Sequence, residues 1–210
     1  ESPEKNPYWC EACLAWFSPI PRCERCGLPT LYSVDLCGRC LREPPLWHRL
    51  YCIGDYQFPL NHYVHQLKYQ KQFWQAKPLA ALLAPRILTP APQICSVPLH
   101  WQRQIQRGFN QSERLAYYLN QHFNSELLPS LFRRTEATPA QKGLNKQQRK
   151  QNLTHAFTLR SCKAIEHIAL VDDVVTTGST VRQLCQLLLE VGVESIDIYC
   201  ICRTPAPTSL

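Results

Sequence analysis

The chain has 210 residues, of which 45% are hydrophobic and 19% are charged, as in ordinary globular proteins. No apolar run approaches the roughly 18 residues that a membrane span requires, so the sequence predicts no membrane span, and no secretory signal is visible at its start. The net charge of +7 fits a polyanionic partner, either a polyphosphate or a nucleic acid, or simply a mildly basic soluble protein without one. No dense block of Lys and Arg marks a nucleic-acid-binding arm.

The first 46 residues are loop-rich and hold three Cys-x-x-Cys pairs, and Pro44 and Pro45 close this segment. Two of the pairs are separated by ten residues, a spacing that places four thiolates around a structural Zn²⁺ ion; the ligands would be Cys23, Cys26, Cys37 and Cys40. The earlier pair, Cys10 and Cys13, is a second candidate for metal, or a redox pair. Because the chain contains no Met, we expect residues upstream of Glu1.

Beyond residue 46 the hydrophobic pattern alternates between strands and helices. It predicts a strand over 51–58, two helices within 60–84 separated at Pro78, a strand over 94–98 and a helix over 112–123. Further strands are predicted over 127–134 and 156–159, and a polar basic loop running into a short helix over 138–152. The closing elements are a strand from His167, a helix over 180–191 that ends at Gly192, and a strand over 195–202. This order predicts an α/β domain over 47–210 with a mainly parallel sheet, preceded by a small metal-binding segment over 1–46.

The segment from Ile168 to Thr180 combines a hydrophobic strand, two adjacent acids and a turn of small residues that opens a helix. Such a turn presents consecutive backbone N–H groups and the positive end of a helix dipole, and Gly178 allows a tight backbone path. The hydroxyl groups of Thr176, Thr177, Ser179 and Thr180 add donors for a phosphate. The acids Asp172 and Asp173 then face sugar hydroxyls or Mg²⁺. The alternative is a plain strand–helix turn whose Thr and Ser residues only cap the helix.

Two further segments suit a phosphorylated ligand. Arg103 and Arg107, in the loop that follows Val97-Pro98-Leu99, carry guanidinium groups that grip phosphate well, and we expect this loop to meet a pyrophosphate. The alternative is a solvated basic turn before a helix. The basic segment 138–152 has the composition of an active-site lid, or of a surface loop without a ligand.

The segment 168–180 resembles the signature of type I phosphoribosyltransferases at all thirteen positions. By this resemblance Asp172 and Asp173 hold the ribose of phosphoribosyl pyrophosphate, and Thr176, Thr177, Gly178, Ser179 and Thr180 hold its 5′-phosphate. Val174 and Val175, which lie between the acids and this turn, belong to the same binding segment. The whole chain resembles the ComF (GntX-like) family in the order of its motifs. These are the cysteine pairs, Pro44-Pro45, His65-Gln-Leu-Lys68-Tyr69, Arg107-Gly-Phe-Asn-Gln111, Thr138-Pro-Ala-Gln141 and the acidic turn. The resemblance adds Lys68 to the residues expected at the ligand, and implies a cytoplasmic protein that handles incoming DNA.

Two functions follow as hypotheses. In the first, the chain is a phosphoribosyltransferase in which Asp172 and Asp173 are the catalytic acids, Mg²⁺ accompanies phosphoribosyl pyrophosphate, and an unidentified acceptor displaces pyrophosphate. In the second, the chain is a non-catalytic binding module whose zinc ribbon and basic face dock single-stranded DNA or a competence helicase. The aromatic residues near the ribbon, such as Trp16 and Trp47, either stack on unpaired bases or pack the two segments together.

Overall fold

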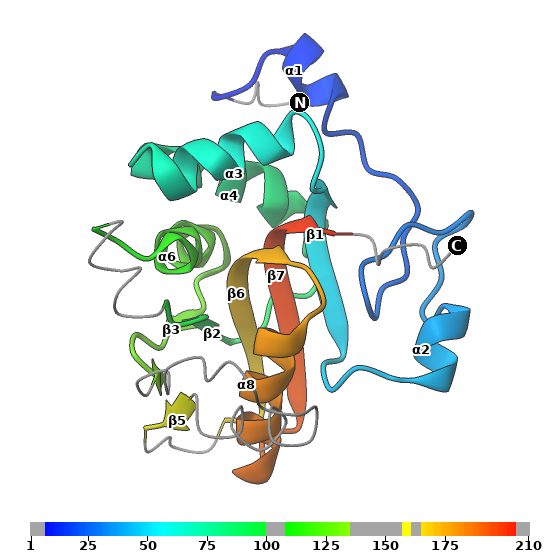
Figure 1. The fold of residues 1–210 in the computed structure, drawn as a ribbon, viewed down its shortest axis with the longest axis vertical. Coiled ribbons are helices and arrows are strands. Elements are labelled where there is room, and N and C mark those ends of the chain that lie inside the picture. Colours follow the sequence, from blue (N-terminus) through cyan, green and yellow to red (C-terminus); the bar gives the residue numbers. More distant parts are fainter. Residues whose placement is uncertain (1–6, 100–107, 135–156, 161–164, 205–210) are drawn as a thin grey trace, which may run out of the picture.

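The computed structural model describes residues 7–99, 108–134, 157–160 and 165–204, and its centre is a five-stranded parallel sheet (Figure 1). The strands lie in the order β1-β7-β6-β2-β3. Their bounds are β1 Arg49–Asp55, β7 Ser195–Arg203, β6 His167–Val175, β2 Gln93–Ser96 and β3 Glu126–Leu127. The α/β architecture expected from the alternating pattern is thereby confirmed.

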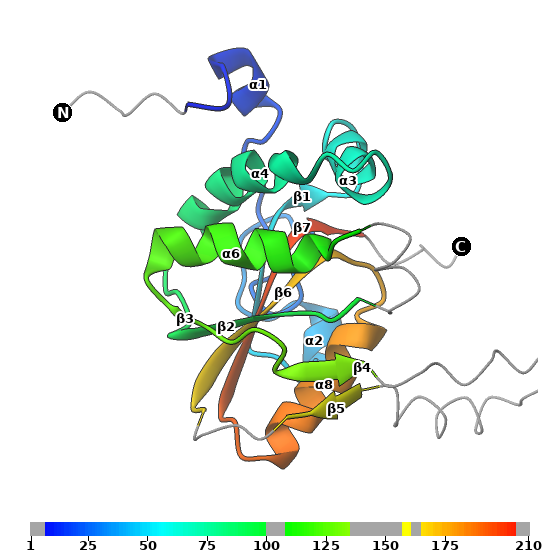
Figure 2. The same ribbon diagram turned by 90° about the vertical axis from the view of Figure 1, so that its left-hand side faces the viewer.

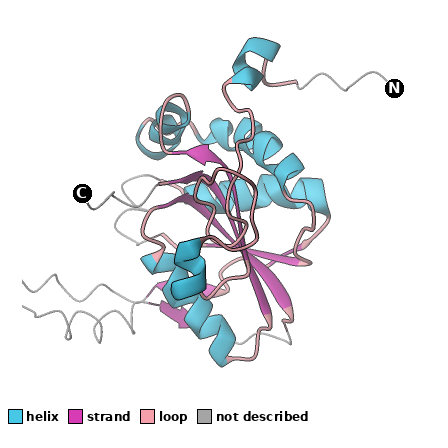
Figure 3. Cartoon of the chain, turned by 90° about the vertical axis from the view of Figure 1, so that its right-hand side faces the viewer, coloured by secondary structure: helices cyan, strands magenta, loops and turns pink. Residues whose placement is uncertain are grey.

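Helices and a hairpin cover the two faces of this sheet (Figures 2 and 3). One face carries α3 Leu60–Tyr69, α4 Ala76–Leu83 and α6 Gln111–Phe123, with the short 3-10 helices η1 Phe73–Gln75 and η2 Ala84–Arg86. The other face carries α8 Ser179–Glu190 and the antiparallel hairpin of β4 Phe132–Arg134 and β5 Phe157–Leu159. Side chains of β7 alternate between the two layers, since Tyr199 and Ile201 pack on the first and Ile198 and Cys200 on the second. None of the helices in the described part of the chain has the length and apolarity to cross a bilayer.

The strand order creates a switch point between β2 and β6. The chain leaves β2 through α6 towards the edge strand β3, whereas it leaves β6 through α8 towards β7 on the opposite side. The two connections therefore diverge and lie on opposite faces of the sheet (Figure 2). In open parallel sheets this divergence leaves a crevice at the carboxyl ends of the two strands, where ligands bind.

The N-terminal segment packs in two separate places. Trp9, which precedes α1 Glu11–Ala15, and Phe17, which follows it, stack against Tyr63 and join the core under α3 and α4. The cysteine-rich part, including α2 Gly38–Arg42, forms a small cluster of its own beside β1. Trp47 links this part to the sheet, because its Nε1 donates to the carbonyl of Arg25 at 2.7 Å and its ring is buried.

Three of the expected boundaries are wrong. Pro78 does not separate the helices of 60–84: the break falls at residues 70–75, and Pro78 is the third residue of α4, where its missing N–H has no helical partner to lose. The strand expected over 127–134 divides into β3 and β4, which belong to different sheets. β1 ends at Asp55, three residues before the expected end. The segment 138–152 lies outside the described residues.

Candidate phosphate site and metal centre

The turn between β6 and α8 has the conformation that an anion cradle requires. Gly178 has φ +77°, in the left-handed region that favours glycine, and it directly precedes the first residue of α8. Among the described residues, the backbone N–H groups of Thr176, Thr177 and Gly178 donate to no acceptor. Ser179 N donates only a long hydrogen bond of 3.4 Å to Thr177 Oγ1. These donors, at the start of a helix of 12 residues, are available to a phosphate.

Two side chains hold the turn from behind. The buried guanidinium of Arg203, at the end of β7, donates to the carbonyls of Val175, Thr176 and Thr204, and to that of Cys26 in the cysteine-rich part. The ring of Trp47 lies under Gly178, where a Cβ would stand 2.9 Å from ring atom Cη2. Glycine is thus required at 178 both by its backbone angle and by this close approach.

The two acids occupy successive positions at the end of β6 and have different partners. Asp173 is buried, and its Oδ1 forms an ion pair with Lys68 Nζ of α3 at 2.7 Å. Asp172 Oδ1 accepts from Ser112 Oγ of α6 at 3.2 Å and from the backbone N–H of Asp173 at 2.8 Å. Burial, followed by the neighbouring carboxylate of Asp173, raises the pKa of Asp172 to about 7.

Of the residues expected at the ligand, the structure gathers Lys68, the two acids and the turn up to Thr180 at the carboxyl end of β6. Val174 and Val175 continue the strand and pack into the two cores on either side of the sheet, so their side chains face the protein interior. Arg103 and Arg107 lie outside the described residues. Asn110, which follows them in the chain, caps α6 with its side chain, and its Nδ2 donates to the carbonyl of Val97.

Three residues that contact the turn or the acids are not predicted from the sequence to lie at the ligand site: Ser112, Trp47 and Arg203. Ser112 follows directly on the motif Arg107–Gln111, which is the one signal that pointed to it. For Trp47 the sequence predicts either base stacking or packing between the two segments, and the structure shows its side chain buried. Arg203 ends an apolar strand and gave no signal, because its acceptors are backbone carbonyls.

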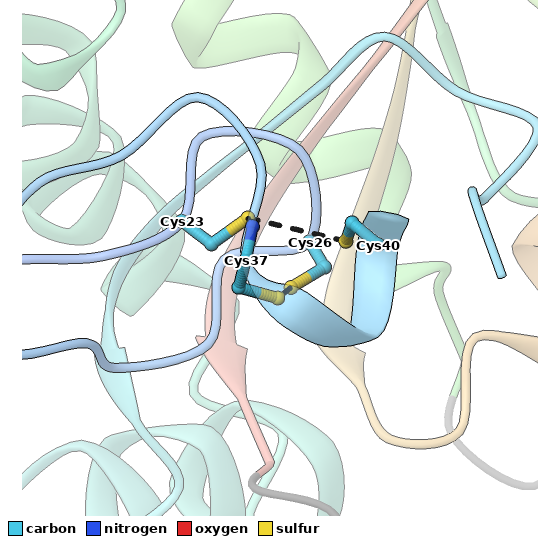
Figure 4. Close-up of side chains that lie close together, drawn as sticks. All are labelled: Cys23, Cys26, Cys37 and Cys40. Carbon is cyan, nitrogen blue, oxygen red and sulfur yellow. Dashed lines mark hydrogen bonds between the residues drawn. The ribbon is translucent and has the colours of Figure 1, made fainter. Parts of the chain in front are cut away.

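The four expected zinc ligands come together. The Sγ atoms of Cys23, Cys26, Cys37 and Cys40 lie within 4.8 Å of one another, with 3.9 Å between Cys23 and Cys40 and 3.7 Å between Cys26 and Cys37 (Figure 4). A tetrahedral zinc site with zinc–sulfur bonds of about 2.3 Å has sulfur–sulfur distances of about 3.8 Å, so the donor set fits Zn²⁺. The backbone N–H of Cys37 also donates to Cys23 Sγ at 3.2 Å, which favours a thiolate there.

Cys10 and Cys13 do not take part in this centre. They lie at α1, which is at the top of Figure 1, well separated from α2 at the lower right. In the part of the chain that the structure describes, no further His, Cys, Asp or Glu gathers with them into a set of three ligands. Hydrogen bonding from Cys13 lowers the pKa of the exposed Cys10 thiol.

Known proteins resemble the chain over most of its length. Residues 107–210 match the phosphoribosyl transferase domain family. The DNA utilization protein YhgH of Escherichia coli (strain K12) is 40% identical over 190 residues, which span 87% of this chain and 84% of that protein. Competence protein F of Haemophilus influenzae is 35% identical over 205 residues, 92% of this chain and 90% of that protein. A purine phosphoribosyltransferase structure from Pyrococcus horikoshii superposes with a TM-score of 0.43 at 18% identity, over 66% of this chain and 80% of that chain.

Proposed function

We propose that this chain, a member of the ComF family, binds phosphoribosyl pyrophosphate. The family is that of competence protein F and the DNA utilization protein YhgH, and the chain contains a phosphoribosyltransferase-type domain. The observation that carries the proposal is the turn at Gly178, whose unengaged amides open α8 beside two acids. This turn lies at the carboxyl end of β6, where the connections from β2 and β6 diverge. The amides bind the 5′-phosphate, while Asp172 and Asp173 accept from the ribose hydroxyls.

The charges around the acids suit a ligand that is itself strongly negative. Lys68 neutralises Asp173, and a pKa of about 7 leaves Asp172 only partly ionised at neutral pH. Both effects reduce repulsion of the incoming phosphates, while the carboxyl oxygens stay available to hydroxyl donors. These oxygens are also hard donors of the kind that Mg²⁺ takes, and bound Mg²⁺ supplies positive charge to the pyrophosphate group.

As an enzyme, the chain transfers the phosphoribosyl group to an acceptor. The acceptor's lone pair forms a bond to the anomeric carbon, the bond from that carbon to the pyrophosphate oxygen breaks, and pyrophosphate leaves with the electron pair. Asp172 and Asp173 hold the ribose in the geometry for this displacement. Arg103 and Arg107 have the right chemistry to stabilise the leaving pyrophosphate.

Calorimetry with phosphoribosyl pyrophosphate and Mg²⁺ on the zinc-loaded chain tests the binding step. We expect saturable binding that falls at least about tenfold when Asp172 and Asp173 are both replaced by Asn, since each Asn offers one carbonyl oxygen to the ribose hydroxyls in place of a carboxyl group. The matched control is Glu194→Gln, which replaces an exposed acid directly before β7. This variant should bind phosphoribosyl pyrophosphate with the affinity of the unmodified chain. Absence of binding by the unmodified chain, or equal affinity in the double variant, would contradict the proposal.

A second function, as a binding module in DNA uptake or utilisation, is favoured by exposed aromatic rings near the site. Tyr69 is the last residue of α3, and Phe73 and Trp74 follow it; 62%, 48% and 55% of their surfaces are exposed. The Arg114 guanidinium of α6 lies 5.8 Å from the centroid of the Phe73 ring. Rings beside a cation suit the stacking of unpaired bases. In this role, within the cytoplasm, the rings contact single-stranded DNA, and the metal-binding segment 1–46 docks a competence helicase.

Turnover separates the two functions. Pyrophosphate release is measured with phosphoribosyl pyrophosphate, Mg²⁺ and a panel of nucleobases and single-stranded oligonucleotides. Release that requires one acceptor and is lost in the Asp172→Asn, Asp173→Asn variant supports the enzyme. Binding without release, together with single-stranded DNA affinity that falls in Trp74→Ala, supports the module.

A further inference from the structure

A cavity of about 620 Å³ lies between the metal-binding segment and the start of α8. Its walls come from α2 and the following Glu43-Pro44-Pro45, from Trp47, and from Thr177, Gly178 and Ser179 of the turn. Cys26 and Leu28 of the metal-binding segment also line it. Asp172 and Asp173 are not among the lining residues, so the cavity lies beside the proposed ribose site and meets the turn together with residues of the metal-binding segment.

Positive charge is concentrated on this cavity. Arg39 and Arg42 of α2 and Arg182 of α8 line it with exposed side chains, against one acid, Glu43. Within the described residues, none of these three guanidinium groups forms an ion pair or a hydrogen bond. Three arginines from two helices that are distant in the sequence thus line the same cavity without an ion-pair partner among the described residues. Guanidinium groups recognise phosphate oxygens through paired N–H donors.

An alternative role for these arginines is to balance the charge of the metal centre, since four thiolates on Zn²⁺ carry a net charge of −2. Arg203 already meets this part of the chain from the buried side, through its hydrogen bond to the Cys26 carbonyl. The three lining arginines are exposed, and in the described part of the chain none of them donates a hydrogen bond to a cysteine sulfur. Zinc content is therefore the readout that distinguishes a charge-balancing role from a ligand-binding one.

We propose that this cavity is a second anion site, which binds the polyphosphate chain of a nucleoside triphosphate. Its volume falls within the roughly 300–1,000 Å³ of pockets that hold small ligands, and it is walled by protein on the sides of α2, Trp47 and α8. The hydroxyl groups of Thr177 and Ser179, which lie 3.1 Å apart, add neutral donors beside the guanidinium groups. Trp47 is buried and exposes little ring surface for a base to stack on, so recognition rests on the phosphates more than on the base.

Because residues 177–179 line this cavity and also form the phosphate turn, the two sites share a wall. A triphosphate bound here meets Thr177, Gly178 and Ser179 on the side of the turn that lines this cavity. Occupancy of one site therefore changes the affinity of the other by a common factor. The second site itself does not depend on the first and is testable when the acids are removed.

The test is calorimetric titration of the zinc-loaded chain with ATP and, separately, with tripolyphosphate. The variants are Arg42→Gln with Arg182→Gln, and the control is Lys77→Gln, which removes one exposed charge on α4. We expect ATP and tripolyphosphate to bind with similar affinity, and the double variant to lose at least about tenfold, as the loss of charged hydrogen bonds predicts. The Lys77 control and the Asp172→Asn, Asp173→Asn variant should keep the affinity of the unmodified chain.

Four results would overturn the proposal: no binding of either polyphosphate, equal binding by the arginine variant, loss of binding in the aspartate variant, or loss of zinc from the arginine variant. Loss in the aspartate variant would assign the triphosphate to the ribose site. Zinc is measured by metal analysis on the same samples. A single-stranded oligonucleotide that binds through these arginines while ATP and tripolyphosphate do not would also reject a triphosphate site.

Discussion

Replacing Gly178 by Ala tests the turn on which the functional proposal depends. At φ +77° a Cβ costs about 1–2 kcal/mol of backbone strain. The new Cβ also meets Trp47 Cη2 at 2.9 Å, closer than an ordinary contact. Relief requires a shift of a buried ring that donates to the Arg25 carbonyl at 2.7 Å, and such overpacking costs about 1–3 kcal/mol more. We expect Gly178→Ala to lose about 2–5 kcal/mol of unfolding free energy.

Gly192→Ala is the matched control. Gly192 has φ +90°, but a Cβ there meets no atom within 4 Å, so its cost is the strain alone, about 1–2 kcal/mol. Urea unfolding followed by circular dichroism, with zinc present, measures both variants. Calorimetry with phosphoribosyl pyrophosphate should show weaker binding only in Gly178→Ala. Equal destabilisation of the two variants would refute the packing argument, and unchanged affinity in Gly178→Ala would refute the role of the turn backbone.

Four other changes probe the site and the metal centre. Lys68→Gln leaves the buried Asp173 without its cation, so we expect a loss of about 1–3 kcal/mol in urea unfolding and weaker ligand binding; unchanged values would mean that the pair is not formed in solution. Asp172→Asn should stabilise the chain at pH 8 more than at pH 5. The reason is that a carboxyl group whose pKa is raised to about 7 in the folded state lowers the unfolding free energy progressively as pH rises from about 4 to 7. If the urea midpoint of the variant differs from that of the unmodified chain by the same amount at pH 5 and at pH 8, the raised pKa is contradicted. Cys37→Ser should abolish binding of one Zn²⁺ per chain by metal analysis, whereas Cys10→Ser should leave it intact, and the reverse outcome would move the centre. Arg203→Lys replaces a planar donor to several carbonyls by a single ammonium, so a loss of about 1–3 kcal/mol is expected in urea, and no loss would show that those bonds do not hold the turn.

Elements with strong local patterns were predicted well from the sequence. The helix expected over 112–123 is α6 Gln111–Phe123, and the closing strand expected over 195–202 is β7 Ser195–Arg203. In α6 the buried residues Leu115, Ala116 and Leu119 recur at helical spacing, whereas β7 is a continuous apolar run that is buried on both faces of the sheet, so each pattern indicates how its element packs. The stop at Gly192 was also predicted, and its φ of +90° is the reason that glycine is found there.

Predictions failed where the outcome depends on distant parts of the chain. The rule that proline breaks a helix fails at Pro78, because a proline in the first turn has no helical hydrogen bond to lose, and α4 begins directly after the 3-10 turn at Phe73–Gln75. The residues 127–134 form an acceptable single strand by composition. They divide because Leu127 pairs with β2 whereas Phe132 pairs with β5, and pairing partners are not a local property.

At the candidate site, too, some features are predictable from the sequence and others are not. The acidic turn and the four cysteines were identified from the sequence, because each depends on residue types at short spacing: consecutive amides and a glycine for an anion, paired thiols for a metal. What the turn touches depended on the tertiary structure alone. Ser112 reaches Asp172 across 60 residues and Arg203 reaches Cys26 across 177, and such contacts follow from strand order and the packing of helices on the sheet. The chemistry of each motif is therefore local, while the partners that set its charge and hold its shape are brought to it by the fold.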